Sequence, residues 1–120
     1  MGAMRTPHLL VLLALSMGCG SRPPIDRTVV GQGNGFSCYR HQIPDSQYFT
    51  DFCYRTQDEC ESSRTHQNTS KCAAAAHAFC FTFLEGGRKT MHCFGAKKNC
   101  ESDARAYAER TTDVSRCEEL

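Results

Sequence analysis

Eight of the nine cysteines fall into two sets of four with matching spacing, and this pattern limits the possible folds more than any other feature. The first set is Cys38, Cys53, Cys60 and Cys72, and the second is Cys80, Cys93, Cys100 and Cys117. Six residues separate the second and third cysteines in both sets, and each third cysteine begins a Cys-Glu-Ser tripeptide. A chain of 120 residues with no tryptophan and a mean hydropathy of −0.48 has little apolar material, a deficit that disulfides commonly offset. We therefore expect a small disulfide-rich α+β fold of two tandem ββα repeats, residues 36–77 and 78–120.

A β-hairpin is predicted at the start of the second repeat. The dipeptide at 86–87 is Gly-Gly, which suits a two-residue turn that needs positive φ at both positions. If Glu85 lies opposite Arg88, counting outward places Cys80 opposite Cys93 at a non-hydrogen-bonded site. Cα atoms at such a site are about 4.5 Å apart, within reach of a disulfide.

The first repeat allows the same count around a four-residue loop at 44–47, which places Cys38 opposite Cys53. Alternation along the strands then gathers large apolar residues on one face of each hairpin, and we expect this face to form core. The face comprises Tyr39, Ile43, Tyr48, Phe52 and Tyr54 in the first hairpin and Phe81, Phe83 and Phe94 in the second. An aromatic platform for carbohydrate is the alternative interpretation.

A helix is predicted after each hairpin. Thr56 and Glu59 form a capping box, which predicts a helix from this point to about His66. A second helix is predicted over 97–110, while the alanines at 73–76 fit either a short helix or a connector. The apolar stripe of the second helix contains Cys100, Ala104, Tyr107 and Ala108.

The cysteine spacing leaves the connectivity of the disulfides open. One pattern closes each hairpin and ties each helix to the tail that follows it. Its bonds are Cys38–Cys53, Cys80–Cys93, Cys60–Cys72 and Cys100–Cys117. The competing pattern joins the hairpin cysteines to the helix cysteines.

The motifs CFTF, CES and VSRC, with their cysteine spacing, give residues 36–120 a resemblance to a known group. They resemble short cysteine repeats in secreted and lipoprotein-type proteins of myxobacteria and related deltaproteobacteria. The first repeat departs from this pattern in its longer hairpin and in its ending, TSKC. The resemblance implies export and disulfide formation, and the group has no established activity.

The N-terminus has the three parts of a secretory signal peptide, which we place at residues 1–18. Arg5 precedes an apolar run at 9–15, and small residues follow. The string SMGC at 16–19 resembles the lipobox of a bacterial lipoprotein precursor, with Ser16 where leucine is usual. The resemblance implies cleavage before Cys19 and attachment of lipid to that cysteine. Alternatively, ordinary signal peptidase cuts nearby and leaves Cys19 as an odd thiol.

Residues 19–35 read as the lipid-attachment cysteine and a flexible tether, because they are rich in glycine and proline. A tether of this length has an end-to-end distance of about 20–25 Å. Gly20 stands where an aspartate favours inner-membrane retention in enterobacteria, so the outer membrane is the expected location.

Charge and motif content argue against several function classes. A net charge of +1 gives no long-range attraction to nucleic acid. The sequence has no C-x2-C pair and no closely spaced histidines, so nothing in it predicts a metal site. It also contains no known catalytic motif. His77 lies near Cys80, but a surface histidine and an oxidised cysteine are the preferred interpretation. We therefore expect no cofactor and no catalysis.

Taken together, these features predict a lipid-anchored cell-envelope protein. Its partners would be the membrane, through Cys19, and a protein of the envelope that the disulfide-stapled domain binds in interaction or adhesion. The alternative is a soluble secreted effector or inhibitor.

Overall fold

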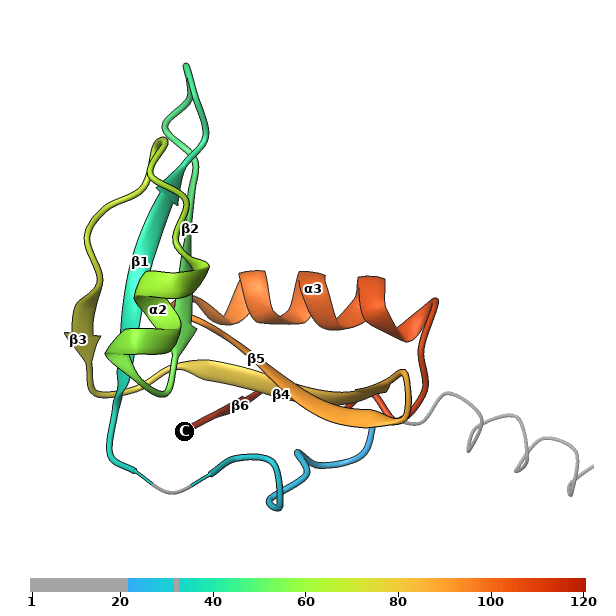
Figure 1. Ribbon diagram of the computed structural model, residues 1–120. Helices are drawn as coiled ribbons and strands as arrows, with labels where there is room; N and C mark the ends of the chain where they lie inside the picture. The colour runs from blue at the N-terminus through green and yellow to red at the C-terminus, as the bar shows by residue number, and fades with distance from the viewer. Residues whose placement is uncertain (1–21, 32) are drawn as a thin grey trace, which may run out of the picture.

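The computed structural model describes residues 22–31 and 33–120, in which six strands and two helices form a small disulfide-rich α+β fold (Figure 1). The strands form one curled antiparallel sheet in the order β3-β1-β2-β5-β4-β6. The strands are β1 (Phe36–Gln42), β2 (Phe49–Tyr54), β3 (Ala73–Ala75), β4 (Phe79–Glu85), β5 (Arg88–Phe94) and β6 (Glu118–Glu119). The helices are α2 (Gln57–Ser63) and α3 (Lys97–Ala108). In Figure 1 the β1–β2 hairpin stands away from the β4–β5 hairpin, beneath which the first described residues run.

Both hairpins have the register that turn counting predicts. Glu85 pairs with Arg88, and Cys80 pairs with Cys93. The turn residues Gly86 and Gly87 have φ of 59° and 76°, a conformation that favours glycine at both positions. The β1–β2 hairpin pairs Cys38 with Cys53.

Four disulfides join the eight paired cysteines. Within the hairpins, Cys38–Cys53 and Cys80–Cys93 each have a Cα–Cα distance of 4.1 Å. Cys60–Cys72 and Cys100–Cys117, each with a Cα–Cα distance of 6.2 Å, tie a helix to the segment that leads into an edge strand. Of the two patterns left open by the sequence, the structure has the one that closes each hairpin.

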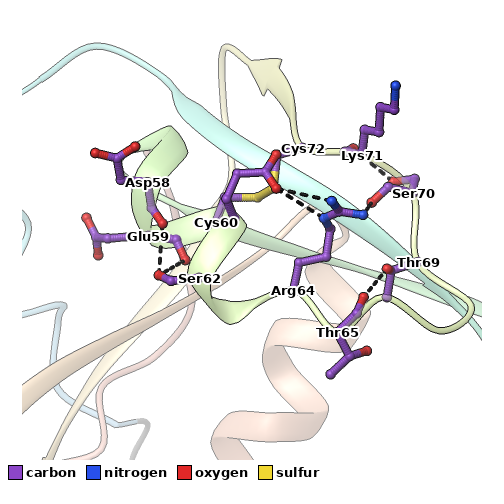
Figure 2. A network of polar contacts seen from close by, with 11 residues as sticks. Asp58, Glu59, Cys60, Ser62, Arg64, Thr65, Thr69, Ser70, Lys71 and Cys72 are labelled. Carbon is purple, nitrogen blue, oxygen red and sulfur yellow. Dashed lines mark hydrogen bonds and ion pairs between the residues drawn. A yellow bond between two sulfur atoms is a disulfide. The ribbon is translucent and has the colours of Figure 1, made fainter.

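Helix α2 starts as the capping box predicts but stops earlier than expected. The Thr56 side chain accepts a hydrogen bond from the Glu59 backbone, and the helix ends at Ser63 rather than near His66. Figure 2 shows the loop that follows, in which the Arg64 guanidinium donates to a carboxylate oxygen of Glu61 and to the Ser70 carbonyl. Residues 64–68 have no apolar side chain to bury, so nothing favours another helical turn.

The alanine run forms strand β3, which is neither the helix nor the connector expected. Ala73 and Ala75 pair with Cys38 and Phe36 of β1. The Cys60–Cys72 bond holds the chain beside the edge of β1, where ladder hydrogen bonds override the helix propensity of alanine. The expectation of a helix or a connector at 73–76 was therefore wrong, because pairing with β1 makes Ala73–Ala75 a strand.

The aromatic face predicted for the second hairpin is core, as expected. Phe81, Phe83 and Phe94 are buried there with Cys100 and Ala104 of α3. On the first hairpin the prediction fails at two positions. Ile43 and Tyr48 are exposed because they lie at the hairpin tip, and the short helix α2 covers only the base.

The first described residues form a strap across the other face of the sheet, so residues 22–30 are not the flexible tether that we predicted. Ile25 is only 3% exposed and packs in a second core cluster with Cys53, Cys80 and Cys93. Its backbone N–H donates to Glu118 at 2.7 Å. Ile25 covers apolar sheet surface that no helix reaches, which explains why this segment is ordered on the domain. Residues 19–21 of the predicted tether lie outside the described residues.

Candidate functional site

The candidate residues named from the sequence differ in what the structure says of them. Cys19 and the signal peptide, residues 1–18, lie outside the described residues. Every described cysteine is in a disulfide, so none of them offers a thiol for catalysis or metal binding. His77 is exposed, with Nδ1 3.3 Å from the Leu120 carbonyl oxygen, as fits the surface interpretation.

The tip of the β1–β2 hairpin is the clearest exposed apolar feature among the residues described, and Figure 1 shows it projecting beyond both helices. Ile43, Tyr48 and Phe49 are the large hydrophobic residues exposed there, and Tyr48 is 66% exposed. Large apolar side chains grouped on a projecting loop are typical of interaction sites.

The tip loop is held in one shape by its own hydrogen bonds. The Gln42 side-chain amide donates to the backbone carbonyls of Ser46 at 2.6 Å and Tyr48 at 3.0 Å. The Tyr48 backbone N–H donates to the Ser46 hydroxyl at 3.0 Å, and Asp45 has a positive φ of 58°. The loop is therefore preorganised, which lowers the entropy lost on binding.

Arg40, which lies opposite Asp51 in the hairpin, contacts the ring of Phe49 on the facing strand. Its guanidinium lies 3.6 Å from the centre of the Phe49 ring and donates to both carboxylate oxygens of Asp51, at 2.8 and 3.0 Å. The hydrogen bond to Asp51 raises the pKa of Arg40 above its ordinary value. An arginine side chain is already charged at physiological pH. One face of Phe49 is thus covered and its orientation fixed.

A second candidate site lies in the angle between the two hairpins, under α3. We call it the aromatic cleft, and its volume is about 270 Å³. Its lining residues are Phe52, Cys53 and Tyr54 of β2, Met91, His92, Cys93 and Phe94 of β5, and Asp103 and Tyr107 of α3. Strand β2 pairs with β5 only at Phe52–Phe94 and Cys53–Cys93, which leaves room beside the ladder for this opening.

His92 is oriented inside the cleft by a carboxylate and by aromatic rings. Its Nδ1 lies 3.2 Å from Oδ2 of Asp103, and its ring is edge-on to Phe81, Phe83 and Tyr107 at 4.8 to 5.7 Å between centroids. His92 and Asp103 lie on different elements, β5 and α3, so no sequence motif connects them. The available signal was the pairing of His92 with Phe81, which puts the imidazole on the aromatic face.

A histidine held by a carboxylate supplies two of the three members of a catalytic triad, which also needs a nucleophile. The described residues that line the cleft include no serine or threonine, and both its cysteines are in disulfides. Its aromatic walls and single carboxylate are features that suit the binding of a ligand.

Two further properties of residues 22–31 and 33–120 bear on the site. No group of three or more His, Cys, Asp or Glu residues among them could hold a metal ion. In the same part of the chain, no helix combines the length and apolarity required to cross a bilayer. Comparisons with protein families, with curated proteins and with solved structures find no match.

Proposed function

We propose that this is a lipid-anchored cell-envelope protein whose disulfide-stapled domain binds a protein partner through the tip of the β1–β2 hairpin. Four disulfides fit a small protein of an oxidising compartment, secreted or in the envelope. The lipobox resemblance at Cys19 and the resemblance to myxobacterial lipoprotein repeats support the anchor. The observation that carries the binding role is the rigid, exposed apolar tip.

Internal symmetry supports the view that the domain is two copies of one ββα unit. Arg40 and Thr82 each lie two residues after the first cysteine of their set, and each forms the same two bonds with a serine. The Arg40 N–H donates to the Ser70 hydroxyl and its carbonyl accepts from the Ser70 N–H, both at 2.8 Å. Thr82 and Ser115 repeat this pair of bonds, again at 2.8 Å.

The two copies differ at their hairpin tips, which supports a role for the first tip. The second hairpin turns through Gly86 and Gly87 between two charged residues, whereas the first has a longer loop flanked by Ile43 and Tyr48. An exposed tyrosine contributes contact area with little loss of side-chain entropy, and tyrosine is enriched at interfaces. The longer loop and its exposed apolar side chains are therefore features of the first copy that the second copy lacks.

The anchor is tested by the intact mass of the mature protein from its host, before and after reduction and alkylation. We expect a chain that starts at Cys19 and carries acyl mass, with eight cysteines alkylated only after reduction. A different start or the absence of lipid mass would overturn the anchored form.

The tip is tested with a photocrosslinking amino acid at position 48 in cells, with position 85 at the tip of the second hairpin as the matched control. We expect one discrete protein adduct from position 48 and none from position 85. Identical patterns from both positions, or none from position 48, would reject the tip as the contact.

A soluble secreted effector or inhibitor is the second candidate, and the preorganised loop is the observation that favours it. Such a protein would be recovered entirely from the medium, without lipid mass. Partition between membranes and medium therefore distinguishes the two forms.

A further inference from the structure

We infer that the aromatic cleft binds an arginine side chain of a partner, with the guanidinium stacked on its aromatic wall and against the Asp103 carboxylate. The inference depends on the cleft alone and not on the lipid anchor or the hairpin tip.

The walls of the cleft suit a planar cation. Phe52 and Phe94 pack against each other, with 5.6 Å between ring centroids and a tilt of 49°, and together form one wall; Tyr107 borders the opening from α3. A guanidinium over such rings is attracted by their π faces. Arg110 already makes such a contact with Tyr107, at 4.2 Å from the ring centre, so the incoming guanidinium would stack on the wall formed by Phe52 rather than on that face of Tyr107.

The carboxylate supplies the charge complement. Asp103 contacts His92 through Oδ2, and among the described residues no lysine or arginine forms an ion pair with it. The other carboxylate oxygen of Asp103, Oδ1, has no hydrogen-bond partner among the described residues and can accept from an incoming cation. Asp103 and His92 are both about one-third exposed, so an incoming cation can reach them.

Size and shape favour arginine over a complete small molecule. The volume of about 270 Å³ lies just below the range of small-molecule pockets, which starts at about 300 Å³. One long side chain fits this space. Arginine is preferred over lysine because its planar head can stack on a ring and form two parallel bonds with a carboxylate.

The test is an NMR titration of the complete mature protein, in its oxidised form, with N-acetyl-L-arginine methylamide. The neutral isostere, N-acetyl-L-citrulline methylamide, is the matched probe. We expect amide shifts at Phe52, His92 and Asp103 with the arginine probe, and at least fivefold weaker binding of citrulline. No shifts in the cleft, or equal binding of the two probes, would overturn the inference, as would tighter binding of the lysine analogue.

Two variants examine the residues themselves, and a third serves as control. Asp103→Asn and Phe52→Leu should each weaken the arginine probe about five- to tenfold. Asp58→Asn, at an exposed position of α2, should leave its affinity unchanged. Native-like amide spectra establish that each variant is folded. Unchanged affinity in both cleft variants would refute the site. Methyl glucoside is titrated in the same way as a carbohydrate probe, and larger amide shifts with it than with the arginine probe would also refute the site.

Discussion

Cys53 and Cys93 lie directly opposite each other in the β2–β5 ladder, although each is bonded to a cysteine of its own hairpin. The two hairpin disulfides therefore lie at the centre of the sheet, where both residues are buried. Beyond the two paired positions of this ladder, the Gly95 N–H donates to the Asp51 carbonyl at 2.9 Å. Because so few contacts join β2 to β5, we expect substitutions at this junction to lower the stability of the domain.

Gly95→Ala should loosen this junction. A Cβ at position 95 would lie 2.8 Å from the Cβ of Asp51, so the strands must move apart. We expect the free energy of unfolding to fall by about 1–3 kcal/mol in urea denaturation. Adding Asp51→Gly to the same chain should recover part of the loss, because it removes the opposing atom. An alanine variant as stable as the parent would contradict the close approach.

Ser115→Ala should destabilise the domain more than the matched change Ser70→Ala. The Ser115 hydroxyl is buried and accepts from the Thr82 N–H at 2.8 Å, so its loss leaves a buried donor unpaired, at about 1–3 kcal/mol. Ser70 makes the equivalent bond at an exposed position, where water can replace it, and we expect about 0.5 kcal/mol or less. Equal losses in thermal unfolding would mean that burial does not set the cost.

Ile25→Ala tests whether the strap belongs to the domain. Truncating this buried side chain should lower the free energy of unfolding by about 2–5 kcal/mol. The neighbouring Pro24 is exposed, and Pro24→Ala serves as control with little expected change. A tether detached from the domain would give two variants of equal stability.

Alkaline pH should destabilise the fold through Tyr39. Burial, with a smaller effect of Tyr54, raises the pKa of Tyr39 to about 12 from 10.0. Between these values the unfolded chain releases this proton and the folded chain keeps it, so stability is full below pH 10 and falls as pH rises to about 12. Tyrosinate absorbance should show one late titration, which Tyr39→Phe removes and Tyr48→Phe leaves. If the late titration persisted in Tyr39→Phe, it would belong to another tyrosine.

Much of the sheet was predictable because local rules apply to it. The turn at Gly86 and Gly87 fixes the register of the second hairpin, and the Thr56 cap marks the start of α2. The register then places the hairpin cysteines within bonding distance.

The remaining features depend on contacts between residues distant in sequence. Ile25 stands between proline and charged residues in a segment without a helix or strand pattern, so its burial follows from the open sheet face and the Glu118 contact and not from any local signal. The exposure of Tyr48 depends on how far α2 extends. His92 and Asp103 meet because α3 crosses the hairpin at one angle, which no local pattern specifies.

The strap gives the domain a reserve of length under tension. If Cys19 is acylated as proposed, a pull between membrane and hairpin tip loads the strap first, and its nine residues, 22–30, extend to about 30 Å when straight. Ile25 must leave its cluster before this slack is released. Once the strap is extended, the Cys38–Cys53 bond prevents the first hairpin from opening. A stretched molecule would then lengthen and shorten again while its hairpin tip stays folded.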